Sequence, residues 1–334
     1  MKASRARGAA EIGVVIPACN EEGNIEPLVA ELHRVLRGHR CQILFVDDGS
    51  TDATLEAIIA ARRRFPAVEY LSLTRNFGHQ HALKAGLDHV AGKCVITMDA
   101  DLQHPPSVIP RLLERWREGW EIVSTIRDDD ASVPWIKRAT ARLFYRLVNL
   151  IAEVKIAEGA ADFRLLDRSV VEVLRRIDEY HPFFRGLVPW TGFRQTSVRY
   201  RPARRHSGRT KYSFWRMVSF ALGGLVSFSI IPLRLATVLG FIMALTGFGI
   251  GLKATVEYLV TRDTAPGWTS TIVVVVLVGG VQLVILGIMG EYLGRMFMEA
   301  KKRPTYIVRA ASKRIATDEH RRAGRRLRDW RRLD

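Results

Sequence analysis

The chain has 334 residues, enough for one large domain and a smaller region. Its formal net charge of +17 favours a polyanionic partner, either nucleic acid or an anionic membrane surface. Residues 217–298 are mostly apolar and no recognised nucleic-acid-binding motif is present, so a membrane is expected and nucleic acid is not. The cysteines Cys19, Cys41 and Cys94 lack zinc-site spacing and are expected to be free thiols in a reducing compartment.

Short apolar runs alternate with helical segments over the first 126 residues. Strands are expected at Ile12–Ile16, Gln42–Val46, Val68–Leu73, Cys94–Met98 and Ile122–Ile126, with a later one at Arg194–Tyr200. Helices are expected at residues 20–36, 52–65, 80–90 and 105–118. This alternation predicts an α/β domain with a mostly parallel sheet and helices on both faces. Ligands bind to such sheets beyond the carboxyl ends of the strands, near the point where the strand order reverses.

Two long apolar stretches follow, Leu235–Val260 and Thr269–Met289. Each is long enough to cross a bilayer, which requires about 20 apolar residues. The loop between them carries one Arg and one Asp, whereas several basic residues flank the outer ends, so both termini are expected in the cytoplasm. Residues 214–228 are expected to form an amphipathic helix that leads to the membrane. The basic N-terminus lacks the apolar core of a signal peptide.

The strongest signal for chemistry is Met98-Asp-Ala-Asp-Leu-Gln103, in which a buried strand ends in two carboxylates, Asp99 and Asp101. Such a pair suits a hard divalent cation that is held together with phosphate oxygens. Mg²⁺ or Mn²⁺ there would neutralise the charge that develops on a nucleotide diphosphate leaving group. The alternative is a turn with two solvated aspartates, because a pair of this kind is common by chance.

Two other predicted strands also end in polar turns. Asp47 and Asp48 follow one strand, and the first strand leads into Pro17-Ala-Cys-Asn-Glu-Glu22. One acid of the pair would accept hydrogen bonds from a base or ribose, and an ordinary polar turn is the alternative. Because three polar strand ends converge on one edge of the sheet, helix capping alone does not account for them.

A dense basic segment precedes the membrane region and contains Arg201, Arg204, Arg205, Arg209 and Lys211. Like charges at this spacing repel one another unless an anion joins them. A diphosphate and a lipid phosphate that meet near the bilayer would supply that anion. The alternative is a basic patch that only binds the membrane surface.

Together these segments resemble the family-2 glycosyltransferases with the nucleotide-sugar-binding fold called GT-A. The resemblance is strongest to the polyprenyl-phosphate branch, which includes dolichyl-phosphate mannose synthase and the bacterial undecaprenyl-phosphate glucosyl- and aminosugar transferases. It covers roughly residues 11–300 and rests on the segments 15–22, 46–52, 75–80, 98–106, 162–165 and 205–211.

The resemblance implies roles for individual residues. The nucleotide-sugar site would include Pro17, Ala18, Glu21, Asp47, Asp48, Asp99, Ala100, Gln103 and Arg127. Asp99 and Asp101 would hold Mg²⁺ or Mn²⁺, and the substrate phosphates would be bound by Arg164, Arg205 and Lys211. Asp101 and Asp162 are the catalytic candidates.

Asp162 has two interpretations, as a base or acceptor-orienting group and as one half of a structural ion pair with Arg164 or another Arg. His79 and His81 would line the pocket, although polar surface histidines are the simpler interpretation. Cys19 departs from the family, which usually has an aromatic residue at this position.

The reaction implied by the resemblance is transfer of a sugar from a nucleotide-sugar, expected to be UDP-linked, to a polyprenyl phosphate, expected to be undecaprenyl phosphate. The displacement would be metal-dependent and inverting, at the cytoplasmic face of the inner membrane, in a multi-pass protein that forms homo-oligomers. One alternative is a processive polysaccharide synthase, which would need a Gln-x-x-Arg-Trp motif that the sequence lacks. A non-catalytic membrane scaffold is the other, and the intact pair Asp99 and Asp101 argues against it.

The expected organisation has five parts. They are a basic N-terminal tail at 1–10, the GT-A catalytic domain at 11–212, an amphipathic juxtamembrane segment at 213–234, two transmembrane helices at 235–298 and a basic cytoplasmic tail at 299–334.

Overall fold

The structure is a computed structural model that describes residues 10–127, 160–201, 231–261 and 267–315. The chain divides into two compact units, one built on a β-sheet and one that contains two long helices. The sheet unit also includes the chain that follows residue 303. Arg205, Lys211 and most of the predicted juxtamembrane segment lie outside the described residues.

The described part of the sheet unit contains an eight-stranded sheet in the order β7-β5-β6-β4-β1-β2-β3-β8. The strands are β1 (Ile12–Ala18), β2 (Cys41–Asp47), β3 (Val68–Leu73), β4 (Cys94–Thr97), β5 (Ile122–Arg127), β6 (Ala160–Asp167), β7 (Gln195–Tyr200) and β8 (Val308–Ala311). Strand β1 pairs in parallel with β2 on one side and β4 on the other. The chain therefore reverses its direction across the sheet at β1, which is the point where α/β sheets bind ligands.

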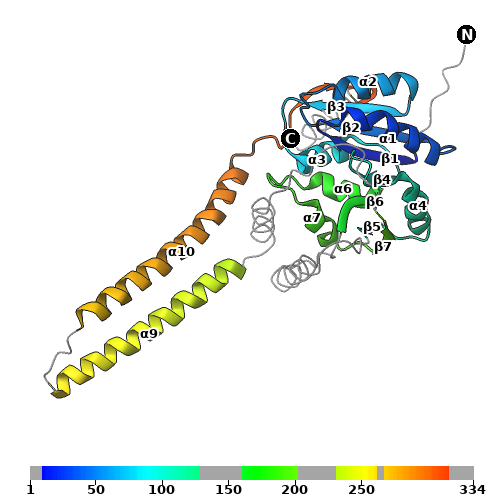
Figure 1. The fold of residues 1–334 in the computed structure, drawn as a ribbon. Coiled ribbons are helices and arrows are strands. Elements are labelled where there is room, and N and C mark those ends of the chain that lie inside the picture. The colour runs from blue at the N-terminus through cyan, green and yellow to red at the C-terminus, as the bar shows by residue number, and fades with distance from the viewer. Residues whose placement is uncertain (1–9, 128–159, 202–230, 262–266, 316–334) are drawn as a thin grey trace, which may run out of the picture. The chain divides into compact units, whose positions relative to one another are not determined.

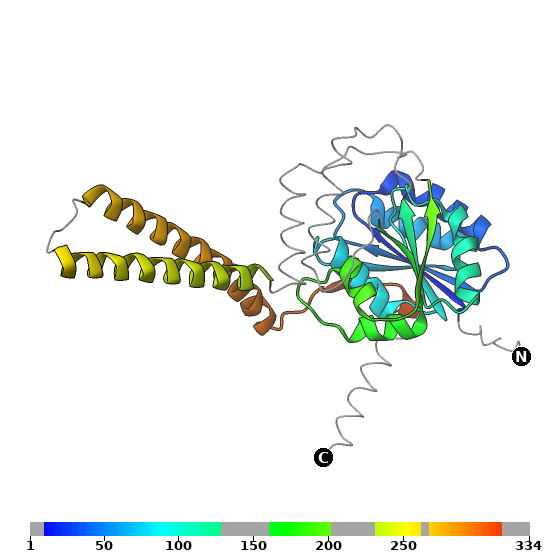
Figure 2. The same ribbon diagram turned by 90° about the horizontal axis from the view of Figure 1, so that it is seen from below.

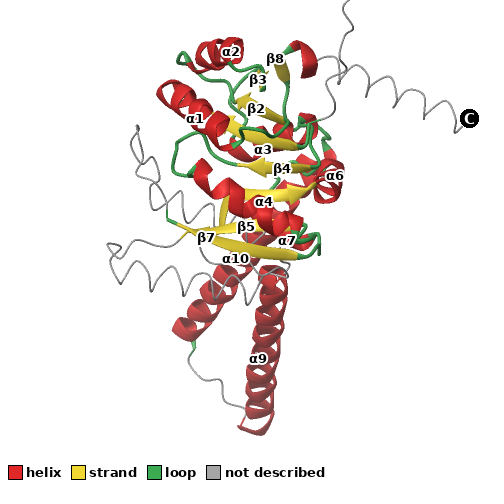
Figure 3. Cartoon of the chain, turned by 90° about the vertical axis from the view of Figure 1, so that its right-hand side faces the viewer, coloured by secondary structure: helices red, strands yellow, loops and turns green. Residues whose placement is uncertain are grey.

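Helices cover both faces of this sheet (Figure 3). They are α1 (Glu22–Val35), α2 (Thr54–Arg64), α3 (His79–His89), a 3-10 turn (Pro106–Val108), α4 (Ile109–Arg117), α6 (Arg168–Arg176) and α7 (Phe184–Trp190). Ile25 of α1, Ile58 of α2 and Leu112 of α4 share one buried cluster with the strands. On α3, Gly86 approaches β1 so closely that a Cβ atom would lie 2.2 Å from Val15 Cγ1. The central strands are therefore apolar on both faces, as is typical of parallel sheets.

The predicted α/β fold is confirmed. The predicted strands agree with β1 to β5 and β7 to within two residues at each end. The sheet is mixed, because β6 is antiparallel to β4 and β5, and β8 is antiparallel to β3. Strand β6 was not predicted, since Asp162 and Arg164 interrupt its apolar pattern, although both side chains are buried.

One domain boundary needs correction, because the range 299–334 is not a tail throughout. Strand β8 pairs with β3 through Ser72 and Ala310, among other pairs. The hydroxyl of Tyr306 donates a hydrogen bond to Asp88 Oδ2 of α3 at 3.0 Å, and Ile315 is buried. The returning chain thereby covers an edge strand whose N–H and C=O groups would otherwise be unpaired.

The second unit contains α9 (Ile231–Thr261) and α10 (Trp268–Ala300), which lie side by side (Figures 1 and 2). Two segments in them are long and apolar enough to cross a membrane, Leu233–Glu257 with a mean hydropathy of 2.0 and Thr271–Ala300 with 2.9. Among the described residues, almost none of either apolar segment is buried. Exposed apolar helices of this length indicate association with a membrane.

The turn after β2 provides a test of the close packing at the edge of the sheet. Gly49 has φ +62° and Gly38 has φ +90°, so alanine at either position costs about 1–2 kcal/mol of backbone strain. A Cβ atom on Gly49 would also lie 2.4 Å from the backbone carbon of Arg75, whereas nothing lies within 4 Å of one on Gly38. We expect Gly49→Ala to lower the thermal unfolding midpoint of the full chain clearly more than Gly38→Ala. Equal decreases of the unfolding midpoint in the two variants would contradict the close approach of the turn after β2 to the loop after β3.

Candidate active site

Hydrogen bonds connect the turns after β1 and β2 at the carboxyl edge of the sheet. The backbone N–H of Asp48 donates a hydrogen bond to the carbonyl of Ala18 at 2.9 Å. The N–H of Glu21 donates to Thr54 Oγ1 at 2.8 Å, so the start of α1 is joined to the start of α2. Pro17 pairs with Val46 within the parallel ladder. The predicted nucleotide-contacting residues of the first turn are thus held beside the second strand end.

Asp48 is buried and joins this edge to the loop after β3. Its Oδ1 accepts a hydrogen bond from the N–H of Phe77 at 2.7 Å, and its Oδ2 accepts one from Gly78 at 2.9 Å. Burial raises the pKa of the Asp48 carboxyl, and the two backbone hydrogen bonds oppose that rise. Asp48 therefore shapes the edge of the site by fixing the loop of residues 77 and 78.

Asp47 is also buried and is bound by other parts of the protein. Its Oδ1 accepts the N–H of Ser50 at 3.0 Å, and its Oδ2 accepts the hydroxyl of Ser72 at 2.8 Å. These bonds form the turn after β2 and connect β2 with β3. The two neighbouring acids thus stabilise different loops around the same strand end.

The loop that carries the aspartate pair follows β4 and has a fixed shape. Asp101 Oδ1 accepts the N–H of Gln103 at 3.1 Å. His104 Nδ1 accepts a hydrogen bond from the backbone N–H of Asp99 at 3.0 Å. An imidazole nitrogen that accepts a hydrogen bond bears no proton, so the 3.7 Å distance from the same nitrogen to the Asp99 carboxylate is not an ion pair. The imidazole is buried and stacks on Phe163 with ring centroids 5.2 Å apart. The packed imidazole therefore holds the backbone at Asp99, and the hydrogen bond from Gln103 orients the Asp101 carboxylate.

One oxygen of Asp99 fits a metal ion. Among the described residues, Asp99 Oδ1 is buried without a hydrogen-bond partner, and His79 Nε2 lies 3.5 Å away. An unsatisfied buried carboxylate oxygen is uncommon, and a hard divalent cation is a suitable partner for it. The described residues contain no group of three Asp, Glu, His or Cys side chains that could hold a metal by themselves. A cation held by Asp99 and Asp101 would therefore need further oxygens from water or a phosphate.

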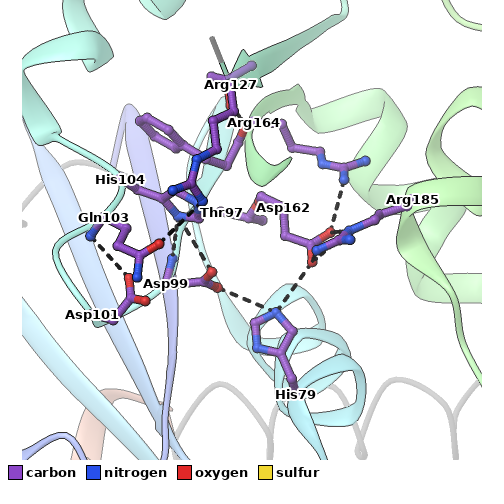
Figure 4. Close-up of polar contacts among 12 residues, drawn as sticks. His79, Thr97, Asp99, Asp101, Gln103, His104, Arg127, Asp162, Arg164 and Arg185 are labelled. Carbon is purple, nitrogen blue, oxygen red and sulfur yellow. Dashed lines mark hydrogen bonds and ion pairs between the residues drawn. The ribbon is translucent and has the colours of Figure 1, made fainter. Parts of the chain in front are cut away.

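Arg127 reaches the same loop from the end of β5. Its Nη1 lies 3.4 Å from Gln103 Oε1, to which it donates, and its side chain is exposed (Figure 4). The structure thereby brings together Gln103 and Arg127, two residues that the sequence predicted for the donor site. Ala100 is buried between the two aspartates.

Asp162 lies in β6 and is 4% exposed. Its carboxylate accepts hydrogen bonds from Arg164 Nη2 at 3.1 Å and from Arg185 of α7, whose Nη2 is 3.0 Å from Oδ2. His79 Nε2 of α3 lies 3.6 Å from Oδ2, so His79 stands between Asp162 and Asp99 (Figure 4). The Thr97 hydroxyl, at the end of β4, donates to the backbone carbonyl of Asp162 at 2.5 Å.

These contacts decide the protonation state of Asp162. Burial by itself raises the pKa of this carboxyl, but the hydrogen bond from His79 and the charges of Arg185 and Arg164 outweigh burial and hold the pKa below its usual range. A carboxylate with a depressed pKa is a weak general base. One of the two interpretations of Asp162 was a structural ion pair with Arg164 or another Arg. In the structure Asp162 forms ion pairs with both Arg164 and Arg185.

Three residues around Asp162 were not assigned to the site by the sequence or were given only as an alternative. Gln80 lies 3.5 Å from Asp162 Oδ2 and also accepts the N–H of Phe184 at 3.0 Å. His79 belongs to the site, and although burial lowers its pKa, the hydrogen bond to Asp162 and the nearby carboxylates raise it overall. Arg185 has no local sequence signal that separates it from other arginines. His81, in contrast, contacts the carbonyl of Tyr180 at 2.9 Å.

Comparison with known proteins agrees with this geometry. The sequence pattern described as "Glycosyl transferase family 2" matches residues 13–175. A glycosyltransferase of Synechocystis sp. without an assigned function is 40% identical over 89% of this chain and 94% of its own length. The bactoprenol glucosyl transferase of Shigella phage SfV is 40% identical over 90% of this chain and 98% of its own length.

A solved structure of glucosyl-3-phosphoglycerate synthase from Mycobacterium tuberculosis, in complex with Mn²⁺, UDP and glucosyl-3-phosphoglycerate, is 19% identical with a TM-score of 0.43. It covers 65% of this chain and 78% of its own length. The conclusion rests on the two full-length relatives. The chain belongs to glycosyl transferase family 2 and is a glycosyltransferase with a GT-A-like mixed α/β domain.

Proposed function

We propose that this glycosyltransferase moves a sugar from a nucleotide-sugar, UDP-linked in our expectation, to undecaprenyl phosphate or a closely related polyprenyl phosphate. The observation that carries the proposal is the Asp99 carboxylate, whose buried Oδ1 has no hydrogen-bond partner among the described residues and lies 3.5 Å from His79 Nε2, at the carboxyl edge of the sheet. The same chain also has two exposed apolar helices. The name of the phage relative, a bactoprenol glucosyl transferase, supports a polyprenyl-phosphate acceptor.

The donor would bind across the ends of β1, β2 and β4. Pro17, Ala18 and Glu21 would border the nucleotide, together with the loop that Asp48 fixes. Asp99 and Asp101 would hold Mg²⁺ or Mn²⁺, which supplies neutralisation of the charge on the leaving diphosphate. Arg127 is exposed beside this loop and would contact the same diphosphate.

The acceptor explains why such a domain is attached to apolar helices. A polyprenyl chain cannot leave the bilayer at low cost, because each buried CH₂ contributes about 0.8 kcal/mol. In our proposal α9 and α10 span the inner membrane, the catalytic domain and both termini lie in the cytoplasm, and the protein forms homo-oligomers. Arg205 and Lys211, outside the described residues, would bind phosphate near the headgroups.

The reaction would be a single inverting displacement at the anomeric carbon. An acceptor phosphate is already ionised near neutral pH, so its attack needs less help from a base than a sugar hydroxyl would. This agrees with the depressed pKa of Asp162, which makes its carboxylate a weak base. The enzyme would then act mainly by aligning the acceptor phosphate, the anomeric carbon and the leaving diphosphate.

Transfer activity tests the proposal directly. Full-length enzyme in detergent would receive labelled UDP- and GDP-sugars, undecaprenyl phosphate and Mg²⁺ or Mn²⁺. We expect one donor to give a labelled lipid, and we expect EDTA, Asp99→Asn and Asp101→Asn each to lower the rate by about 100-fold or more. The Asp variants should keep the wild-type unfolding midpoint. A labelled lipid that forms at the same rate with EDTA would exclude the metal-dependent mechanism.

Thiol labelling tests the place of the donor without a turnover assay. Cys19 and Cys41 are both half-buried, but Cys19 follows β1 at the carboxyl edge of the sheet and Cys41 begins β2 at the opposite edge. We expect UDP with Mn²⁺ to slow alkylation of Cys19 at least about fivefold and to leave Cys41 unchanged. Burial raises the pKa of the Cys94 thiol to about 12, so it should stay unlabelled and serve as an internal control. Equal protection of Cys19 and Cys41 would count against this donor site.

A further inference from the structure

The two arginines that contact Asp162 differ in what they can offer to a ligand. The Arg164 side chain is 5% exposed, and its Nη1 donates to the backbone carbonyl of Phe184 at 3.2 Å. The Arg185 side chain is 35% exposed. Arg164 therefore belongs to the interior of the domain, and Arg185 is the arginine of this pair that a substrate can reach.

Asp162 fixes the direction of the Arg185 guanidinium. Arg185 Nε lies 3.2 Å from both carboxylate oxygens and Nη2 lies 3.0 Å from Oδ2, so two of its nitrogens bind one rigid partner. Asp162 is itself held by Arg164 and through its backbone by Thr97. A guanidinium that is already oriented loses little conformational entropy when it binds an oxyanion.

The charges at this cluster are suited to an anion. Two guanidinium groups and the imidazole of His79 contact the Asp162 carboxylate, and His79 also lies 3.5 Å from Asp99 Oδ1. Arginine is the residue that binds phosphate with two parallel hydrogen bonds. The ligand chemistry that fits the exposed side of Arg185 is therefore a phosphate.

The position of Arg185 indicates which substrate phosphate it would bind, the diphosphate of the donor or the phosphate of the acceptor. Gln103 and Asp101 lie on one side of Asp99, and Asp162 with Arg185 lies on the other side (Figure 4). His79 approaches both Asp99 and Asp162. In an in-line displacement the attacking and leaving oxygens face each other across the reacting carbon. If the leaving diphosphate is bound at Asp99 and Asp101, a phosphate at Arg185 is on the side of the attacking group.

We propose that Arg185 binds the phosphate of the acceptor lipid and that Asp162 is a positioning residue, which holds Arg185 in place instead of acting as the base. The proposal rests on the proposed function, because it assigns the acceptor side of the same site. Arg164 stabilises Asp162 and does not touch the substrate.

Steady-state kinetics of the full-length enzyme test this assignment. We expect Arg185→Gln to raise the KM for polyprenyl phosphate by about tenfold or more, with the donor KM and the Kd of UDP with Mn²⁺ within about twofold of wild type. Arg185→Lys should restore part of the acceptor affinity, because it keeps the charge but not the forked geometry. Asp162→Asn should raise the acceptor KM in the same way. The double variant Asp162→Asn with Arg185→Gln should show much less than the sum of the two effects.

Arg194→Gln is the matched control. Arg194 is an exposed arginine of the same unit that donates to the carbonyl of Gly119. All kinetic constants should stay at wild-type values in this variant. Unfolding midpoints are measured for every variant, and if Asp162→Asn does not fold, Arg185→Gln and Arg185→Lys decide the assignment.

Three outcomes would overturn the proposal. An increase of the donor KM in Arg185→Gln with an unchanged acceptor KM would assign Arg185 to the diphosphate. A loss of kcat alone in Arg185→Gln would remove its binding role. A loss of kcat in Asp162→Asn with an unchanged acceptor KM would make Asp162 the base.

Failure of the proposed function itself gives a different pattern. Wild-type enzyme would then transfer no sugar to polyprenyl phosphate from any donor. Direct binding of farnesyl phosphate to wild type and to Arg185→Gln still decides the role of Arg185 in that case. Weaker binding by the variant supports the phosphate site, and equal binding overturns it.

Discussion

The buried carboxylate of Asp162 connects parts of the chain that are far apart in sequence. It lies in β6, and its partners come from α3 (His79 and Gln80) and α7 (Arg185). A buried carboxylate is costly unless charged and hydrogen-bonding partners surround it, so each of these elements has to be in place for the fold to be stable. The same contacts arrange a half-buried arginine, Arg185, and the histidine His79 near the aspartate pair after β4. Stability of the domain and shape of the site thus depend on one network.

Acidic residues at the ends of β2 and β4 have different roles. Asp47 and Asp48 accept hydrogen bonds from backbone N–H groups of nearby loops, and Asp47 also accepts the hydroxyl of Ser72 in β3. Loops at the edge of a parallel sheet contain N–H groups that have no strand partner, and buried carboxylates satisfy them. Asp99 differs because one of its oxygens has no such partner among the described residues. That difference separates the acids that build the edge of the site from the acid that is available to a cation.

The chain returns to the sheet after α10, so the helical unit is an insertion within the sequence of the sheet unit. Strand β8 adds to the free edge of β3, and Tyr306 binds Asp88 of α3. The sheet unit is therefore completed by residues on both sides of the apolar helices in the sequence. A segment that reads as a basic tail contributes backbone hydrogen bonds to the domain that carries the site.

The sequence alone determined the α/β class, most strand positions, the apolar helices and the aspartate pair, because these produce local or periodic patterns: continuous apolar runs in strands buried on both faces, and carboxylates where such runs end. Tertiary structure decided the rest. Strand β6 carries Asp162 and Arg164 in its interior, so its pattern does not read as a strand until their partners are known. The pairing of Asp162 with Arg185, and of β8 with β3, joins residues that are distant in the chain. Such contacts arise only when the folded backbone brings the residues together, and no periodicity in the sequence records them.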